Sequence, residues 1–525
     1  MIKFSDKRSW NVSKFDNHNL YYYGNLDIVE KIIKELIKKN KIDRLFYEKI
    51  INNEFFSFFG FIFDYKDKIY SSTDHCRSKP IFYCNDKEFQ ITNDSNLIIN
   101  NKKISQNNLN EYILSGYVSN NETLYNNLLQ IEAGTYLIYE KKNNNINCYQ
   151  YYQYIPNLNK NSNNNLASLF NIFNNILDIN FKNIITKYKN NNFWIALSGG
   201  RDSTLVLCKL IENGCTNITA YTYGSKINND DAIKAKNLCS KLNIKWIFID
   251  VSKKDIKEFI STNHFELYYK YVSDNSSFPN FLDYFALIKL KKLNKLNKKS
   301  IILNGHTGDY ISGGHIPNLN LHINKDKTIE DLIFNQHYKL QKKSTLYVTE
   351  YIKSKIKTKL KKIDSNQYKI ENLYEFWEFE ERQSKFILNG QKNYDFLELN
   401  SIIPLWDIKV VNFFKDLSLN LKRNKKFYLE YLDNYNYKNV FAKSKFNNNE
   451  WSGKLSFIRY FLFVIKILFG KKIRNYLQQI LQYYGQNHYL FSIVSFKIYF
   501  LEFQNIRNPY SFWIKYTVNL FYKTK

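Results

Sequence analysis

The hydrophobic and polar positions along the chain follow two patterns, and the change comes near residue 156. Before that point, short apolar runs between polar turns predict β-strands. The expected elements are the hairpins Phe56–Asp64 with Lys68–Ser72 and Lys79–Tyr83 with Glu88–Thr92, a helix over Leu109–Ser115, and closing strands over Gly134–Glu140 and Asn147–Tyr154. The polar stretch Asn157–Asn165 then predicts a linker.

Beyond the linker, apolar runs of strand length alternate with longer segments of helical periodicity. The predicted strands are 193–197, 218–222, 245–250 and 300–303, and the predicted helices are Leu166–Lys187, 203–213, 230–242 and roughly 281–294. This alternation is typical of an α/β fold with a doubly wound parallel sheet, where ligands bind beyond the carboxyl ends of the strands. From about residue 325 onward the pattern is mainly helical.

A chain of 525 residues exceeds one hydrophobic core, so we expect three parts: 1–156, 166–450 and 451–525. The last part contains the apolar runs Tyr460–Ile465 and Tyr489–Val494, which are too short to span a bilayer. Charged residues interrupt this tail repeatedly, so we expect amphipathic helices packed on a domain. Peripheral contact with a membrane surface is the alternative.

The net charge of +28 would ordinarily suggest a nucleic-acid or membrane partner. Lysine is spread along the whole chain beside abundant Asn, Ile, Tyr and Phe, and we find no RNA-binding module, so no nucleic-acid partner is expected. The six cysteines lack metal-ligand spacing, which favours reduced thiols. The start Met1-Ile-Lys-Phe has no apolar signal core. Together these features predict a cytoplasmic protein without a transmembrane segment.

The segment that follows strand 193–197 carries the clearest chemistry: Ser198-Gly199-Gly200-Arg201-Asp202-Ser203, at the head of an apolar helix. Adjacent glycines allow a tight turn and bring backbone N–H groups close to a ligand. With two serine hydroxyls and a helix N-terminus, this makes a cradle suited to phosphate. The segment matches the pyrophosphate loop Ser-Gly-Gly-X-Asp-Ser of ATP pyrophosphatases and lacks the Gly-Lys-Ser/Thr of the Walker loop. An ordinary strand–turn–helix is the alternative.

A second glycine loop, Asn304-Gly305-His306-Thr307-Gly308-Asp309, follows strand 300–303. Asp202 and Asp309 therefore end two strands on the same side of the predicted sheet. Two carboxylates that face bound ATP are suited to hold Mg²⁺, which keeps some waters and bridges to phosphate. Alternatively, Asp309 is an ordinary turn or cap residue.

Over most of its length the chain resembles the asparagine synthetase family. The segments that carry this resemblance are the two loops, Ile403-Pro-Leu-Trp-Asp407, Lys443-Ser-Lys-Phe446, Gly60-Phe-Ile-Phe-Asp64, Thr73–Tyr83, Ser115-Gly116, Thr123-Leu-Tyr125 and Ala133-Gly134. Glu380–Lys385, together with Pro404-Leu-Trp-Asp407, resembles the same segments in a bacterial subgroup associated with surface polysaccharide. The resemblance implies a glutaminase-like β-sandwich of the Ntn type over 1–156, followed by an ATP-pyrophosphatase domain.

The resemblance also implies a set of site residues. ATP would contact Leu197, Ser198, Gly199, Gly200, Asp202, Ser203, Tyr223, Asn304 and Gly305, and Mg²⁺ would be held by Asp202 and Asp309. Lys443 matches the lysine that holds the polyphosphate and neutralises developing charge. In so lysine-rich a chain, a solvated surface lysine is the alternative. Lys426 is a weaker neighbour.

The chain departs from the family at two places. Active members use a cysteine after the initiator methionine as nucleophile, whereas this sequence has Ile2, so we expect no glutaminase activity. Ammonia would then come free or from a separate glutaminase. In the second loop, His306 replaces the Glu or Tyr of relatives, and Asn400 stands where the Tyr-containing relatives have a Glu. His306 is either a general base for the attacking amine or a hydrogen-bond donor.

These features predict an AMP-forming amide ligase that uses ATP and Mg²⁺. A small carboxylate would form an acyl-adenylate, and ammonia or an amine would displace AMP. Asparagine synthase is the nearest activity, and modification of a sugar acid is physically as plausible. The alternatives are a pyrophosphatase-loop enzyme that modifies tRNA, which the basic charge favours, and a catalytically silent scaffold.

Overall fold

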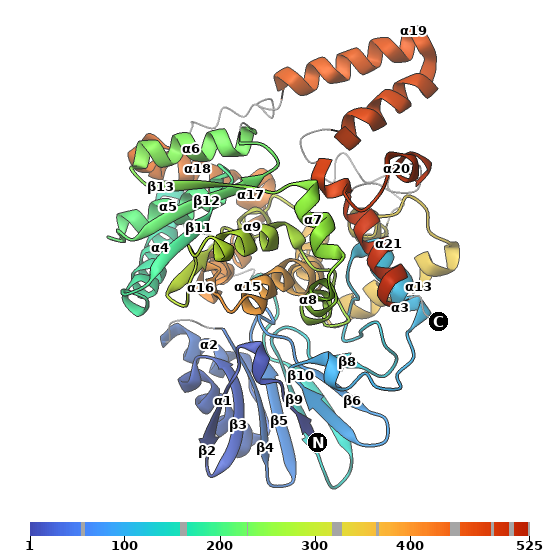
Figure 1. Ribbon diagram of the computed structural model, residues 1–525. Coiled ribbons are helices and arrows are strands. Elements are labelled where there is room, and N and C mark those ends of the chain that lie inside the picture. Colours follow the sequence, from blue (N-terminus) through green and yellow to red (C-terminus); the bar gives the residue numbers. More distant parts are fainter. Residues whose placement is uncertain are drawn as a thin grey trace.

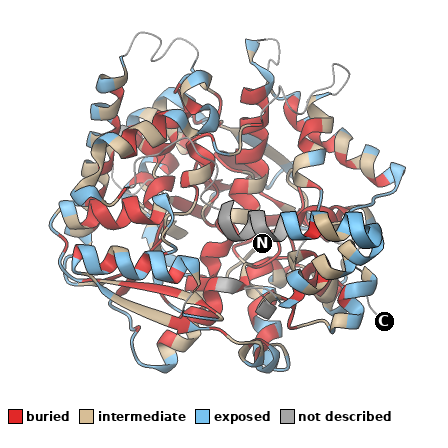
Figure 2. Ribbon diagram, turned by 90° about the horizontal axis from the view of Figure 1, so that it is seen from above, coloured by how far each residue is buried: buried red, intermediate tan, exposed pale blue. Residues whose placement is uncertain are grey.

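The computed structural model describes residues 1–53, 58–157, 165–227, 229–317, 328–363, 367–441, 452–484, 488–502 and 509–522. Two β-sheets make up most of the N-terminal half, and a parallel sheet surrounded by helices lies above them in Figure 1. Buried residues concentrate in the centre of the molecule when it is seen from above (Figure 2). The α/β fold predicted from the sequence is confirmed.

In the N-terminal half, a four-stranded sheet of order β1-β7-β6-β8 faces a six-stranded sheet of order β10-β9-β5-β4-β3-β2. The strands are β1 Ile2–Lys3, β2 Asn11–Phe15, β3 His18–Gly24, β4 Phe59–Tyr65, β5 Lys68–Thr73, β6 Phe82–Asn85, β7 Phe89–Thr92, β8 Leu129–Gln130, β9 Thr135–Glu140 and β10 Asn145–Gln150. Alternate side chains of β4 point to opposite faces, as the strand period requires. Ile62 packs between the sheets, whereas Phe61 and Phe63 pack against α1 (Leu26–Lys39).

The second sheet has the order β13-β12-β11-β14-β15, and every neighbouring pair is parallel. Its strands are β11 Asn192–Ala196, β12 Ile218–Gly224, β13 Lys245–Asp250, β14 Ser300–Leu303 and β15 Asn400–Ile402. Phe193 and Ile195 of β11 join one buried cluster, and Trp194 joins another on the opposite face. Burial on both faces explains why these strands are continuously apolar.

The remaining helices lie around the sheets (Figure 1). They are α2 Arg44–Asn53, α3 Gln106–Ser115, α4 Leu166–Lys187, α5 Arg201–Glu212, α6 Asp230–Leu242, α7 Lys253–Ile260, α8 Asn263–Ser273, α9 Phe281–Lys292, α10 Gly308–Ile311, α12 Ile329–His337, α13 Leu346–Leu360, α14 Ile370–Glu378, α15 Lys392–Phe396, α16 Ile408–Lys415, α17 Leu419–Lys422 and α18 Lys426–Tyr435. A π-helical segment, η4 (Phe379–Ile387), continues α14.

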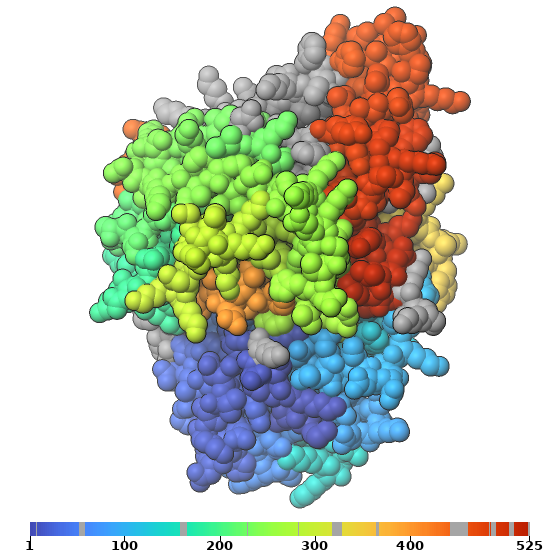
Figure 3. Space-filling model, in the orientation of Figure 1, coloured from blue at the N-terminus to red at the C-terminus, as the bar shows by residue number. Residues whose placement is uncertain are grey.

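The C-terminal tail is helical, as expected: α19 Ser452–Tyr484, α20 Phe496–Glu502 and α21 Pro509–Phe521. Trp513 and Ile514 of α21 are buried beside α3. The expected packing on a domain is therefore confirmed for α21, but it is wrong for much of α19, which projects from the molecule (Figures 1 and 3). No helix within the described residues is long and apolar enough to cross a membrane.

Buried ion pairs join the two halves. Lys359 of α13 lies 2.6 Å from Glu132 of the N-terminal half and 3.3 Å from both Glu380 and Glu381 of η4. Glu381 also accepts a hydrogen bond from the backbone N–H of Asn120 at 2.8 Å. A buried charge is tolerated only when it is paired, so this cluster requires both halves to be in place.

Several predicted boundaries need correction. The predicted strand Asn147–Tyr154 ends at Gln150, because the N–H groups of Tyr151 and Tyr152 both donate to the carbonyl of Gly134. Strand β6 begins at Phe82 rather than Lys79. The predicted start of the first hairpin at Phe56 falls within residues 54–57, outside the described residues.

Candidate functional site

The first glycine loop connects β11 to α5 at the carboxyl end of the sheet. Gly199 has a φ of +68°, and a Cβ there would lie 2.5 Å from the Cβ of Lys234. Gly200 precedes the first residue of α5, and no side chain caps that helix end. Ser198 and Gly200 are exposed. The uncapped N–H groups and the Ser198 hydroxyl therefore form an accessible site of the kind that binds phosphate.

The second loop connects β14 to α10 and interlocks with the first. A Cβ on Gly308 would lie 2.3 Å from Cγ of Asp202, and a Cβ on Gly305 would lie 2.6 Å from the backbone nitrogen of Ser203. Both positions thus require glycine. Between them, Thr307 has a φ of +79°, a strained conformation for a β-branched residue. Strain of this kind clusters at functional sites.

Asp202 and Asp309 share a cationic neighbour, Lys425, which directly precedes α18. Lys425 forms an ion pair with Oδ1 of Asp309 and interacts electrostatically with Asp202. Burial raises the pKa of Asp202, which the hydrogen bond donated by Tyr428 at 2.8 Å and the charge of Lys425 only partly oppose. Asp202 is therefore a half-buried carboxylate whose charged form is stabilised by a nearby cation. The structure brings together the two predicted metal ligands and adds a lysine between them.

This donor set fits Mg²⁺. The metal takes hard oxygen ligands and is commonly held by one or two carboxylates together with waters and substrate phosphates. Asp202 and Asp309 supply two such carboxylates beside the phosphate-type loop. The described residues contain one cluster of three His, Cys, Asp or Glu ligand atoms, Asp74-His75-Cys76, but Asp74 is occupied by backbone N–H groups, including those of Phe59 and Ser78.

Asp309, whose side chain is half exposed, continues into a hydrogen-bonded chain that ends at the buried Glu378. His315 lies 3.0 Å from Oδ2 of Asp309 through Nε2 and 2.5 Å from Glu378 through Nδ1. Burial raises the pKa of Glu378, but the hydrogen bond from His315 and the nearby His337 and Arg382 outweigh it, leaving the pKa at about 2. An ionised Glu378 holds His315, and His315 in turn orients Asp309.

The hydrogen bonds around His306 fix its orientation. The backbone N–H of His306 donates to Oδ1 of Asn304 at 3.2 Å, so the Asn304 amide nitrogen points to Oε1 of Gln391, at 3.3 Å. Gln391 must then present its amide nitrogen to Nδ1 of His306, 3.0 Å away. In a neutral ring the proton is therefore on Nε2. Burial lowers the pKa of His306 to about 4, which keeps the ring neutral near pH 7.

A second network supports the same loop. Asn304 also donates to the hydroxyl of Tyr394 at 3.3 Å, and Tyr394 donates to Asp283. Tyr221 of β12 donates to the other oxygen of Asp283 at 3.0 Å. The loop is thus held by polar side chains from β12, α9 and the segment that precedes β15.

The other predicted site residues lie in different places. Leu197 follows β11 and is buried, and Tyr223 lies near the carboxyl end of β12, so both are at the loop edge of the sheet. Asn400 pairs with Ile301 at the amino end of β15, so it lies away from the loops. Lys443 lies within residues 442–450, outside the described residues.

Several residues at the site were missed by sequence reasoning: Asp283, His315, Glu378, Gln391, Tyr394, Lys425 and Tyr428. Their contacts are long-range, since Tyr428 and Asp202 are 226 positions apart in sequence. Lys425 and Tyr428 have the i, i+3 spacing of neighbours at a helix start, which is a weak signal in a lysine-rich chain.

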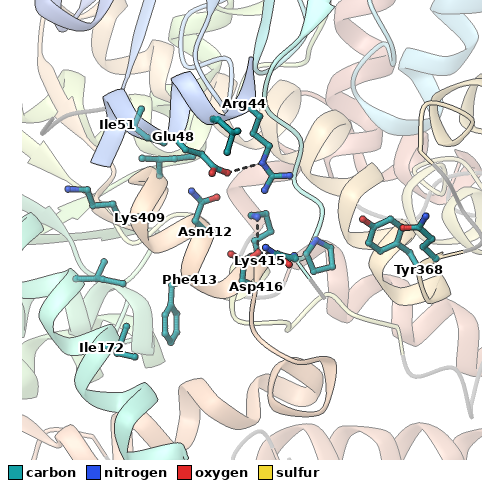
Figure 4. A pocket seen from close by; sticks show the side chains of 16 residues that line it. Arg44, Glu48, Ile51, Ile172, Tyr368, Lys409, Asn412, Phe413, Lys415 and Asp416 are labelled. Atoms are coloured by element: carbon teal, nitrogen blue, oxygen red, sulfur yellow. Dashed lines mark hydrogen bonds and ion pairs between the residues drawn. The ribbon is translucent and has the colours of Figure 1, made fainter. Parts of the chain in front are cut away.

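A cavity of about 830 Å³ lies elsewhere, at the junction of the two halves. Figure 4 shows Arg44 and Glu48 of α2 on one side and Asn412, Lys415 and Asp416 on the other. Four of its charged side chains form ion pairs: Arg44 with Glu48 at 2.8 Å and Lys415 with Asp416 at 2.7 Å. The glycine loops do not line this cavity, so we assign it no part in the site.

The N-terminal half offers no activated thiol. Burial raises the pKa of all six cysteines (Cys76, Cys84, Cys148, Cys208, Cys215 and Cys239). The thiolate is the nucleophile, and reactive cysteines have a lowered pKa. Ile2 pairs with Ile91 and packs between the two sheets, so its role here is structural.

Comparison with known proteins gives one family match. Residues 192–431 match the family described as asparagine synthase, a region that contains both glycine loops and the first part of α18. None of the curated protein sequences compared with the chain matches it. Among solved structures, an NH3-dependent NAD synthetase from Campylobacter jejuni subsp. jejuni NCTC 11168, in complex with the nitrate ion, is 16% identical with a TM-score of 0.22. The match covers 36% of this chain and 93% of that one, and at this TM-score it supports no further conclusion.

Proposed function

Starting from the asparagine synthase domain over residues 192–431, we propose that the protein is an ATP-dependent, AMP-forming amide ligase. A carboxylate oxygen of a small substrate attacks the α-phosphorus of ATP, which forms an acyl-adenylate and releases pyrophosphate. Ammonia or an amine then attacks the acyl carbon, and AMP leaves. The observation that carries this proposal is the interlocking of the two glycine loops, which sets Asp202 and Asp309 beside an uncapped helix N-terminus.

The chain's residues would act mainly by holding charge. The backbone of the Ser198–Ser203 loop and the N-terminus of α5 bind the polyphosphate. Asp202 and Asp309 would hold Mg²⁺, which when bound screens the phosphate charges. Lys425 would exchange its carboxylate partner for the phosphates and stabilise the charge on the departing pyrophosphate. Lys443, which relates by its motif to the family's polyphosphate lysine, is proposed to assist there.

For His306 we propose the role of hydrogen-bond donor. Nδ1 accepts from Gln391, so a neutral ring has Nε2–H available and no free lone pair for a base. A donor at this position would polarise the acyl oxygen or orient the carboxylate. His306→Ala should then slow both pyrophosphate–ATP exchange and product formation. A base for the amine would instead leave exchange largely intact and slow product formation on the order of a hundredfold.

Pyrophosphate release with ATP, Mg²⁺, ammonium and a panel of carboxylates, including aspartate and uronic acids, tests the activity. We expect release with at least one carboxylate, and a loss on the order of a hundredfold or more in Asp202→Asn. Asp64→Asn, which alters an exposed carboxylate in the N-terminal half, should retain full activity. Absence of ATP binding, or normal release by Asp202→Asn, would overturn the proposal.

We also propose that the N-terminal half does not hydrolyse glutamine and that ammonia arrives free or from a separate glutaminase. The raised pKa of every cysteine supports this. Any amidation should proceed with ammonium salts and not with glutamine alone. Glutamate released from glutamine by the purified protein would contradict it.

A further inference from the structure

Exposed apolar side chains gather in one part of the C-terminal tail. Thirteen of the 28 exposed large hydrophobic residues in the described part of the chain lie between Tyr460 and Leu501. We define the C-terminal apolar face by five residues of α19: Phe461, Phe463, Ile467, Leu468 and Phe469, each 44–66% exposed. Such a concentration marks an interaction surface, because monomeric proteins rarely expose contiguous apolar patches of this kind.

The C-terminal end of α19 is fixed to the body of the protein by aromatic and hydrogen-bond contacts, whereas the apolar face lies further along the helix. At the end of α19, the Tyr483 ring lies 5.5 Å from Phe491 and 5.1 Å from Tyr499. Lys253 of α7 lies 4.8 Å from the same ring, and Trp513 of α21 donates to the carbonyl of Leu490 at 2.8 Å. The end of α19 is therefore packed close to α7 and α21, and the rest of the helix projects from there (Figures 1 and 3).

A bend shapes the projection. Gly470 has a φ of +81°, with no atom within 4 Å of the position its Cβ would take. The helix divides there into two arms (Figure 1), with Ile467, Leu468 and Phe469 directly before the bend. The apolar side chains at the bend are 57–66% exposed, so the tip of the projection is available for contact.

The charges around the tip have one sign. The sequence of α19 contains no Asp or Glu, and Lys466, Lys471 and Lys472 are exposed beside the apolar side chains. Interfacial helices combine apolar side chains that enter the headgroup and acyl boundary with cations that attract anionic lipids. No described helix is able to span a bilayer, so contact would stay at the surface.

We propose that the C-terminal apolar face binds the surface of a membrane that contains anionic lipids. The tip of α19 lies in the interface, with Ile467, Leu468 and Phe469 below the headgroups and the three lysines among them. Pairing with a second copy is less favoured, because it would bring the same cations together and like charges across an interface repel. This inference does not depend on the proposed ligase activity.

Co-sedimentation of the full chain with vesicles tests the proposal. The protein should bind vesicles of phosphatidylcholine with phosphatidylglycerol, bind pure phosphatidylcholine more weakly, and lose affinity as salt rises. The triple variant Ile467→Glu, Leu468→Glu, Phe469→Glu should lose at least tenfold in partitioning. The matched control carries Leu267→Glu, Leu293→Glu and Leu346→Glu, which alter exposed leucines elsewhere, and should bind as the wild type does.

A second variant keeps the test decisive if the triple variant misfolds. Substitution of Lys466, Lys471 and Lys472 by Gln alters only exposed amines and should weaken binding to anionic vesicles about fivefold per lysine. Absence of vesicle binding, or equal binding by both tip variants and wild type, would overturn the proposal. So would self-association of the wild type, seen by sedimentation velocity without vesicle binding and lost in the triple variant.

Discussion

At the scale of single residues, the site depends on pairs of side chains that set each other's charge and orientation. Gln391 fixes the tautomer of His306, and Glu378 fixes His315, which in turn orients Asp309. Burial raises the pKa of Asp202. Tyr428 donates a hydrogen bond to this carboxylate, and Lys425 places a positive charge near it. The arrangements around His306 and Lys425 lead to two measurable predictions.

The first prediction concerns the acid side of the stability curve. The pKa of His306 falls to about 4 in the folded protein, so between about pH 6.5 and 4 the unfolded chain binds a proton at His306 that the folded one does not. The free energy of unfolding should therefore decrease as the pH falls through this range, and less steeply in His306→Asn. Denaturant unfolding at a series of pH values measures the slope.

A matched pair of substitutions at Gln391 sharpens this test. Gln391→Glu puts a carboxylate against Nδ1, which favours the imidazolium and should raise the pKa of His306. The free energy of unfolding should then decrease less steeply as the pH falls from about 6.5 to 4. Gln391→Leu removes the donor without adding charge and should keep the pKa low. Identical slopes for the two variants would contradict the assigned contact.

The second prediction distinguishes two adjacent lysines. Lys425 pairs with Asp309, whereas Lys426 is exposed at the first position of α18. Lys425→Met should reduce pyrophosphate–ATP exchange on the order of a hundredfold, because a cation beside the developing charge is lost. Lys426→Met should retain near-normal exchange. Equal losses in both variants would mean that Lys425 contributes only to the overall positive charge of this region and that its contact with Asp309 has no special role.

At the scale of elements, close approach of the two loops is the determining feature. Gly308→Ala would place a methyl group 2.3 Å from Cγ of Asp202, so the loops must separate. We expect a loss of roughly 1–3 kcal/mol in the free energy of unfolding and a larger fractional loss of activity. Gly390→Ala is the control, since its nearest atom would be 3.6 Å away. Chemical denaturation and pyrophosphate–ATP exchange, measured on the same samples, compare the stability and activity of the two variants.

The elements also show what sequence reasoning is able to find. Helix α4 and strand β13 coincide with their predicted bounds, because strong periodicity and flanking polar residues mark both ends. Strand β15 was missed, since three residues give no period and only pairing with β14 makes them a strand. The loop residues at the site were predicted from glycine spacing. Gln391, Tyr394 and Lys425 were not, because their roles arise from contacts between distant segments.

At the scale of the whole molecule, buried ion pairs join the apolar clusters that hold the two halves together. Lys359 is 1% exposed and faces three carboxylates, and burial raises the pKa of one of them, Glu380, to about 7. Lys359→Met would leave these carboxylates without their shared cation. We expect a loss of about 3–5 kcal/mol in the free energy of unfolding.

The control for this prediction is Lys353→Met, two turns earlier on the same helix, where a more exposed lysine pairs with Asp331 at 2.9 Å. Surface pairs contribute about 0–1 kcal/mol, so this variant should unfold close to wild type. If both variants lose the same small amount, the junction tolerates unpaired carboxylates and the halves are held mainly by apolar contacts.

The position of α21 has a consequence for how the protein is made. Its Trp513 and Ile514 complete a buried cluster that includes Leu109 and Tyr112 of α3, a helix near the start of the chain. During translation α3 emerges long before α21, so the part of α3 that α21 covers stays exposed while the segments between them are synthesised. Truncations that lack α21 should leave this apolar surface of α3 exposed permanently. Production at low temperature or with added chaperones should therefore raise the soluble yield more for such truncations than for the full chain.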